Sequence, residues 1–254
     1  MNVREFCDCM ERIAPKALAK EYDNVGLLVP PERTEIKRVL LALDCTPVTV
    51  AEAIELEADL ILTHHPILFR PIRTLDGNTS ELACIRELLK HGIGMFAAHT
   101  NLDGCIGGVN DCLAERLGLT DVLPMPSDPL GRMGKLPQEI TLKAFAELCR
   151  ETLHNGVQVL GDLESKVRTV GMVGGSGGDE AVLAKQDGCD VYLTGEMKHH
   201  EALEAQHAGI CCVVAGHYET EMIVLKSLAT RLQNEFFDVK YTVTRKEQAV
   251  LPCF

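Results

Sequence analysis

The chain has no tryptophan and only 4 tyrosines and 7 phenylalanines among its 254 residues, so any hydrophobic core must be built from aliphatic side chains. Basic residues are also scarce, with 25 Lys and Arg against 37 Asp and Glu. The resulting net charge of −12 argues against a general nucleic-acid-binding protein, which usually has a basic face. No apolar run approaches the roughly 20 residues that a membrane-spanning helix needs, so we expect no membrane association.

Cysteine, in contrast, is abundant, with 11 residues. An odd number cannot pair completely within one chain, and the first residues predict an amphipathic helix over 3–13 rather than a secretion signal. We therefore expect a protein of the reducing cytoplasm, with most cysteines buried as free thiols.

The sequence contains an internal repeat. Residues 39–63 align without a gap on residues 170–194, a displacement of 131 positions, and both copies predict a strand, a helix and a second strand. Strands that alternate with helices of this length indicate parallel β-α-β units. The identical pairs are Val39 and Val170, Ala53 and Ala184, Asp59 and Asp190, Leu62 and Leu193, and Thr63 and Thr194.

The repeat predicts an α/β fold of two similar, duplicated domains, with a metal site in the cleft between them. Residues 121–129 are rich in proline, which excludes regular structure, and are the expected linker. The first domain is predicted to include residues 1–126 together with 216–254, and the second residues 127–215. A final helix over 221–234 and a strand over 239–244 are expected to pack on the first domain.

Two adjacent histidines, His64 and His65, follow an apolar run that predicts a strand. Because successive side chains of a strand point to opposite faces, both rings cannot reach one site from inside it. Pro66 restricts His65 and predicts that the strand ends there. Beyond that end both rings can turn toward the carboxyl edge of the sheet, where open α/β sheets bind their ligands.

Two later segments each place a histidine after an apolar run and an acid four residues further on, at His99 and Asp103 and at His217 and Glu221. A lone histidine near a strand is more often structural. Imidazole and carboxylate groups gathered at several strand ends instead favour a metal site for zinc, iron or manganese. More donors are present than one tetrahedral ion needs, so we expect two divalent ions at these strand ends.

Two softer predictions concern the second copy. The loop with Gly174, Gly175, Ser176 and Gly177 follows a strand and precedes a helix, so its amides can bind phosphate, although such glycines are often only structural. Glu196 aligns with His65 and, with His99, is a candidate for proton transfer. Lys198 and His199 can hold a substrate or its phosphate, although residues 198–206 also read as a charged helix start.

These motifs together resemble the NIF-three-like (NGG-one-interacting-factor-three-like) family, whose members are also described as type 2 homologues of GTP cyclohydrolase I. The resemblance extends from residue 22 to residue 221, and its length matches the compact form without a central inserted domain. Tyr22 stands where the family often has tryptophan. The matching segments are Tyr22-Asp23-Asn24-Val25-Gly26-Leu27, His64-His65-Pro66, His99-Thr100-Asn101-Leu102-Asp103, the glycine loop, Thr194-Gly195-Glu196 with Lys198-His199-His200, and Gly216-His217-Tyr218-Glu219-Thr220-Glu221.

The resemblance implies a dinuclear site with His64, His65, Asp103, His217 and Glu221 as ligands and with Glu221 bridging the ions. It also implies a toroidal homohexamer, built as a trimer of dimers. The expected activity is hydrolysis of a small-molecule substrate, a purine nucleotide such as GTP or a related heterocycle, by a metal-activated water. A metal-dependent phosphoesterase and a non-catalytic metal carrier or scaffold are the alternatives.

Overall fold

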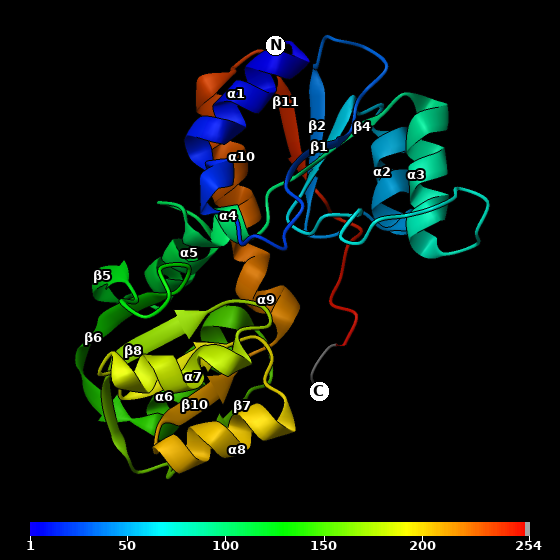
Figure 1. Ribbon diagram of the computed structural model, residues 1–254. Helices are drawn as coiled ribbons and strands as arrows, with labels where there is room; N and C mark the ends of the chain where they lie inside the picture. The colour runs from blue at the N-terminus through cyan, green and yellow to red at the C-terminus, as the bar shows by residue number, and fades with distance from the viewer. Residues whose placement is uncertain (252–254) are drawn as a thin grey trace. The chain divides into compact units, whose positions relative to one another are not determined.

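The computed structural model describes residues 1–251, and the chain divides into two compact units (Figure 1). The first unit consists of Met1–Cys105 and Leu225–Gln248. The second consists of Ile106–Val224 and the described residues from Ala249 onward.

A five-stranded sheet forms the centre of the first unit, in the order β1-β4-β3-β2-β11. All neighbouring pairs are parallel except β1 and β4. Helices α2 and α3 cover one face of this sheet, and α1 and α10 lie on the other face (Figure 1). The strands are β1 (Gly26–Val29), β2 (Arg38–Ala42), β3 (Leu60–Thr63), β4 (Gly94–Ala97) and β11 (Lys240–Val243), and the helices are α1 (Val3–Ile13), η1 (Lys16–Leu18), α2 (Pro47–Glu55), α3 (Ser80–His91), α4 (Thr100–Gly104) and α10 (Ile223–Glu235).

The second unit contains a six-stranded mixed sheet in the order β5-β6-β8-β9-β10-β7, with a parallel centre of β8, β9 and β10. Helix α6 packs on one face, and α7 and α8 pack on the other (Figure 1). The strands are β5 (Thr120–Pro124), β6 (Arg132–Thr141), β7 (Gln158–Leu160), β8 (Lys166–Val173), β9 (Val191–Thr194) and β10 (Cys211–Val214), and the helices are α5 (Val109–Arg116), α6 (Leu142–Leu153), η2 (Gly178–Glu180), α7 (Ala181–Gln186), α8 (His199–Ala208) and α9 (His217–Glu221).

The strand registers confirm the duplication. Val39 pairs with Leu60 in the first sheet, and Val170 pairs with Val191 in the second, so both partners are displaced by the same 131 residues. The aspartate that precedes the second strand of each copy also repeats its contacts. The Asp59 carboxylate accepts the amides of residues 37 and 38, and the Asp190 carboxylate accepts those of residues 168 and 169. The predicted fold class of two similar α/β domains is confirmed.

The boundaries between the units differ from the sequence prediction. The proline segment does not lead out of a domain, because β5 pairs with β6 in an antiparallel hairpin, with Pro124 opposite Arg132. A proline is tolerated there because β5 is an edge strand and needs no ladder bond on its outer side. The chain therefore leaves the first unit at residue 105 rather than 126 and returns at residue 225 rather than 216.

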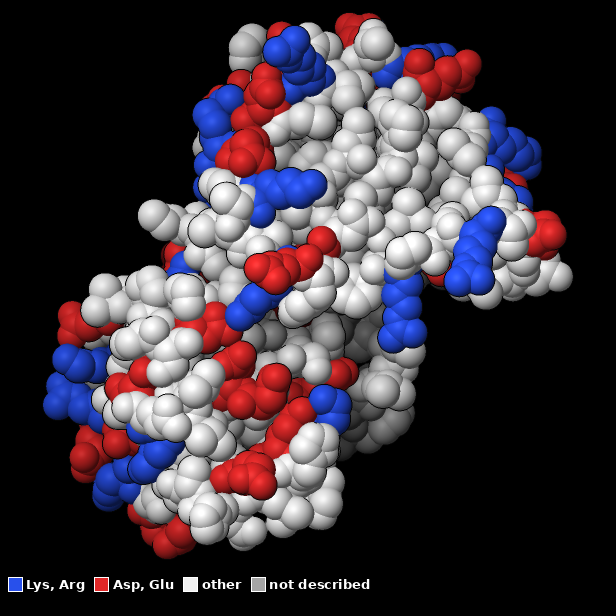
Figure 2. Space-filling model, in the orientation of Figure 1, with Lys and Arg blue, Asp and Glu red and all other residues white. Residues whose placement is uncertain are grey.

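Other sequence expectations agree with the structure. The final strand β11 and all of α10 after its first two residues belong to the first unit, where β11 pairs with β2. Every cysteine within residues 1–251 is a free thiol. None of the helices in that range combines the length and apolar character that a membrane crossing requires. On the face visible in Figure 2, acidic and basic side chains are interspersed in each unit.

Candidate metal centre

The end of β3 brings His64 and His65 into one cluster, as we predicted from the position of Pro66. The amide of His65 still donates to the Leu43 carbonyl at 2.8 Å, and the Thr63 hydroxyl donates to the His65 carbonyl at 2.7 Å. These bonds fix the backbone of the two histidines just beyond the last residue of the strand. Both side chains can then reach the same side of the sheet edge.

Three imidazoles of the first unit form a group that could hold a metal ion. One ligand atom from each of His64, His65 and His99 lies within 4.8 Å of the others. His64 is almost fully buried, and its ring lies 4.9 Å from that of His65 and 5.1 Å from that of His99. The prediction named His99 as a proton-transfer residue; the structure places it with the potential ligands.

Each of these imidazoles has an oxygen acceptor at Nδ1. His64 Nδ1 lies 2.9 Å from the Ala98 carbonyl, His65 Nδ1 2.9 Å from an Asp44 carboxylate oxygen, and His99 Nδ1 2.9 Å from an Asp23 carboxylate oxygen. An acceptor at Nδ1 places the proton on that nitrogen and makes Nε2 the nitrogen that can ligate a metal. This arrangement is typical of metal-binding histidines.

The pKa of Asp23 is lowered by its hydrogen bonds. Burial by itself would raise its pKa, but hydrogen bonds from the His99 ring and from the hydroxyl and amide of Thr100 outweigh that effect and lower the pKa to about 2. Asp23 is therefore ionised at neutral pH and holds His99 by a charge-assisted hydrogen bond. The sequence pattern did not identify Asp23 or Asp44 as partners of these rings, although Asp23 belongs to the Tyr22-Asp23-Asn24 motif.

Asp103 also reaches this group. Its carboxylate oxygen lies 3.5 Å from His64 Nε2, the nitrogen expected to ligate a metal. Three imidazole nitrogens and one carboxylate oxygen fit a first-row divalent cation, because zinc, iron and manganese accept both nitrogen and oxygen ligands. The first unit thus supplies a donor set of His64, His65, His99 and Asp103.

The second unit supplies two more predicted ligands on one short helix. His217 and Glu221 are four residues apart on α9, and His217 Nε2 lies 3.0 Å from a Glu221 carboxylate oxygen. Glu196 lies on the other side of the ring, 3.3 Å from His217 Nδ1. Glu196, predicted to transfer protons, is thus also placed to orient His217 in the way that Asp44 and Asp23 orient their histidines.

The two His-x-x-x-acid segments are not equivalent in structure. His99 is the residue before α4, whereas His217 is the first residue of α9. As a result His217 and Glu221 lie on one face of their helix, while His99 turns to Asp23 and leaves Asp103 near His64. The spacing alone could not show this difference of one position.

The glycine loop packs against Glu221. A Cβ atom at Gly175, whose φ is +64°, would collide with the Glu221 carboxylate and lie 3.3 Å from His217 Nε2. The amides of Gly174, Gly175 and Gly177 donate to the side chains of Asn110, Thr220 and Thr194, respectively. These contacts support a role in accommodating Glu221 and argue against phosphate binding by those amides.

Ser176 and the start of α8 complete the set of predicted residues. Ser176 is exposed within the glycine loop, and His199 is exposed as the first residue of α8. Lys198 is the residue before that helix; its backbone amide donates to a Glu201 carboxylate oxygen at 2.7 Å, and its Nζ lies 2.8 Å from the other oxygen. This arrangement matches the alternative of a charged helix start. Binding of a substrate by Lys198 or His199 stays a prediction.

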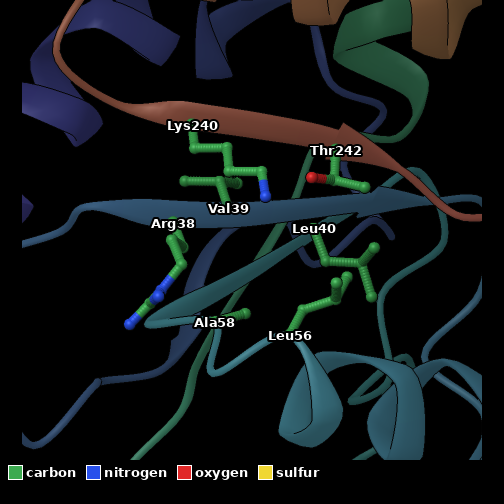
Figure 3. A pocket seen from close by; sticks show the side chains of 7 residues that line it. All are labelled: Arg38, Val39, Leu40, Leu56, Ala58, Lys240 and Thr242. Carbon is green, nitrogen blue, oxygen red and sulfur yellow. The ribbon is translucent and has the colours of Figure 1, made fainter.

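Two pockets of the first unit lie away from the group formed by His64, His65 and His99. The one in Figure 3 holds about 10 Å³ between β2, β11 and the end of α2, which is room for about one water molecule. The larger one, about 300 Å³, is lined by Arg38, Asp59, His91 and neighbouring residues near the amino ends of the parallel strands. The histidine group lies at the opposite, carboxyl ends.

Comparisons with known proteins agree with these features. The model of the family described as Duf34/NIF3 (NGG1p interacting factor 3) matches residues 1–249. A GTP cyclohydrolase 1 type 2 homolog of Clostridium perfringens is 34% identical, with 97% of each chain covered. One of Streptomyces coelicolor is 36% identical and covers 87% of this chain and 81% of its own. The crystal structure of a Bacillus cereus protein related to NIF3 superimposes with a TM-score of 0.91 at 26% identity, covering 99% of this chain and 98% of that one.

Proposed function

Since the chain belongs to the Duf34/NIF3 family, we propose that it is a dinuclear metal-dependent hydrolase acting on a purine nucleotide or a related heterocycle. The family and the histidine group are the findings from which the proposal starts. We further propose that His64, His65, Asp103, His217 and Glu221 ligate two divalent ions, with His99 of the same histidine group as a further donor.

The orientation of the imidazoles carries this proposal. In both units a histidine has an oxygen at Nδ1 and a carboxylate oxygen near Nε2: Asp103 at His64 and Glu221 at His217. A purely structural histidine needs only one such partner. When bound, a pair of divalent ions would act as a Lewis acid that makes water a nucleophile near neutral pH.

The other side chains have separate roles in the proposal. Glu221 is 4% exposed and has two carboxylate oxygens, so it can serve both ions. Asp44, Asp23 and the Ala98 carbonyl hold the protons at Nδ1 of the first unit's histidines. The Glu196 side chain is 54% exposed, so its carboxylate can exchange a proton with solvent while it faces His217 Nδ1.

The replacement Glu221→Gln tests the proposal, with Glu219→Gln on the same helix as the matched control. Protein purified without a metal-affinity tag is analysed by elemental mass spectrometry and then assayed with GTP in the metal found. For the unchanged protein and the control we expect about two ions per chain and hydrolytic opening of the purine ring of GTP. We expect Glu221→Gln to lose both properties, and unchanged turnover in that variant would contradict the mechanism.

The same measurements separate the alternatives. Release of inorganic phosphate without ring opening would indicate a phosphoesterase that uses the same ions. Two exchangeable ions and no turnover across a panel of nucleotides would indicate a metal carrier. If the two units held separate ions, His65→Ala would lose only one of them.

Assembly and location form the last part of the proposal. We propose the homohexamer that the family resemblance implies, which light scattering can test as a sixfold multiple of the 27.8 kDa chain mass. The free thiols fit a reducing compartment, so we place the proposed activity in the cytoplasm.

A further inference from the structure

An exposed pair of aromatic side chains adjoins the histidine group of the first unit. The rings of Tyr22 and Phe69 meet edge to face with centroids 6.3 Å apart, and Phe69 lies 6.1 Å from the ring of His99. Such pairs usually contribute to a core. Here Tyr22 is 67% exposed and Phe69 is 45% exposed, so the pair contributes little to the core.

A hydrogen bond joins the two segments that carry this pair. Asn24 donates from its side chain to the Leu68 carbonyl at 2.6 Å, which joins the segment of Tyr22 to the segment of Phe69. Asp23, between Tyr22 and Asn24, holds His99 through a carboxylate side chain that has no exposed surface. The Tyr22-Asp23-Asn24 motif therefore links the aromatic pair to one of the candidate ligands through consecutive residues.

The charges around the pair indicate what it could bind. Arg70 follows Phe69 directly, and Arg73 lies three positions further on. Both arginines are exposed, and residues 69–73 include no acid, in a chain with a net charge of −12. Aromatic faces favour a planar ring, and guanidinium groups favour phosphate, so the combination is typical of a nucleotide site.

We infer that Tyr22 and Phe69 form a stacking platform for the base of a nucleotide, with Arg70 and Arg73 supplying positive charge for its phosphates. The inference rests on the proposed function, because it names the part of the same site that recognises the heterocycle. It assigns to Tyr22 and Phe69 a role in specificity that metal ligation does not require.

The test compares two probes on the metal-loaded protein by isothermal titration calorimetry: GTP and inorganic triphosphate, which has phosphates but no ring. Since stacking of a base on an aromatic side chain is worth about 1–3 kcal/mol, Tyr22→Ala and Phe69→Ala should weaken GTP binding about 5- to 150-fold. Triphosphate affinity and metal content should not change. Tyr22→Phe should bind GTP like the unchanged protein.

Phe237→Ala is the matched control, because Phe237 belongs to the same unit and is 89% exposed. It should leave both affinities unchanged. If unchanged protein binds metal but prefers GTP no more than triphosphate, the inference is wrong and the proposed metal centre stands. If the protein holds no metal but Tyr22→Ala still weakens GTP binding, the inference is supported and the proposed function is wrong. If Tyr22→Ala changes the mass of the assembly in solution but leaves the GTP affinity unchanged, Tyr22 contributes to a contact between protein chains and the inference is wrong.

Discussion

The two units share a strand register but differ at the loops that follow the strands. In both, a threonine ends the second strand of the repeat, and its hydroxyl oxygen faces the carbonyl oxygen two residues further on, at 2.7 Å for Thr63 and His65 and at 3.5 Å for Thr194 and Glu196. In the first unit the loops carry imidazoles that are held by carboxylates. In the second, glycines make room for Glu221. The backbone scaffold is thus common, and the difference in chemistry arises from a few side chains at the strand ends.

The largest expected effect concerns the crowded glycine of the second unit. Gly175→Ala places a methyl group against the Glu221 carboxylate at a positive φ, and it should lower the free energy of unfolding by about 2–4 kcal/mol and displace the carboxylate. The control is Gly188→Ala, because Gly188 has a φ of +87° and no atom within 4 Å of the added Cβ, so it measures backbone strain alone. Urea denaturation measures both. Equal losses would show that crowding by Glu221 has no effect.

The second prediction compares the carboxylates that orient the histidines. Asp23→Asn should reduce metal affinity about 10- to 100-fold, since the Asp23 side chain has no exposed surface and holds His99 at 2.9 Å. Glu196→Gln should cost less, because Glu196 is 54% exposed and 3.3 Å from His217. Competition with a chelator of known affinity measures both values. A larger loss of metal affinity for Glu196→Gln than for Asp23→Asn would contradict this prediction.

The third prediction uses the equivalent threonines. Thr194 accepts the Gly177 amide and donates to the Gly175 carbonyl, whereas Thr63 donates to the His65 carbonyl. Valine at position 194 leaves a buried amide without its acceptor and should cost about 1–3 kcal/mol. Thr63→Val should cost only about 0.5–1.5 kcal/mol. Thermal unfolding followed by circular dichroism compares the two, and equal costs would show that the glycine loop does not depend on Thr194.

The smallest expected effect is the part of the pH dependence of stability that arises from Asp23 in the first unit. Because the pKa of Asp23 is lowered from 3.8 to about 2 in the folded protein, its contribution to stability is complete above about pH 5 and is lost as the pH falls toward 2. Metal-free Asp23→Asn should therefore lose less stability than the unchanged protein over this range, by about 1–2 kcal/mol. Urea titrations at several pH values measure the slope. If the unfolding free energies of the two proteins changed equally with pH, the lowered pKa of Asp23 would be contradicted.

Much of this organisation could be predicted from the sequence, because it depends on local patterns. Pro66 lacks a backbone donor, which predicts the end of β3. The repeat, whose copies lie 131 residues apart, predicts two α/β domains with equivalent strands. The proline segment was misread as a linker because local composition does not show whether an edge strand pairs with a neighbour. β5 pairs with β6, and that is a tertiary contact.

The sequence by itself determined which residue types gather at the strand ends, because parallel strands bring their carboxyl ends to one edge of a sheet. Only the tertiary structure decided how those side chains are held. Asp23 reaches His99 across 76 residues, and Thr220 reaches Gly175 across 45. Hydrogen bonds of this kind depend on distances of about 3 Å between segments remote in the chain, and no periodicity or spacing encodes them.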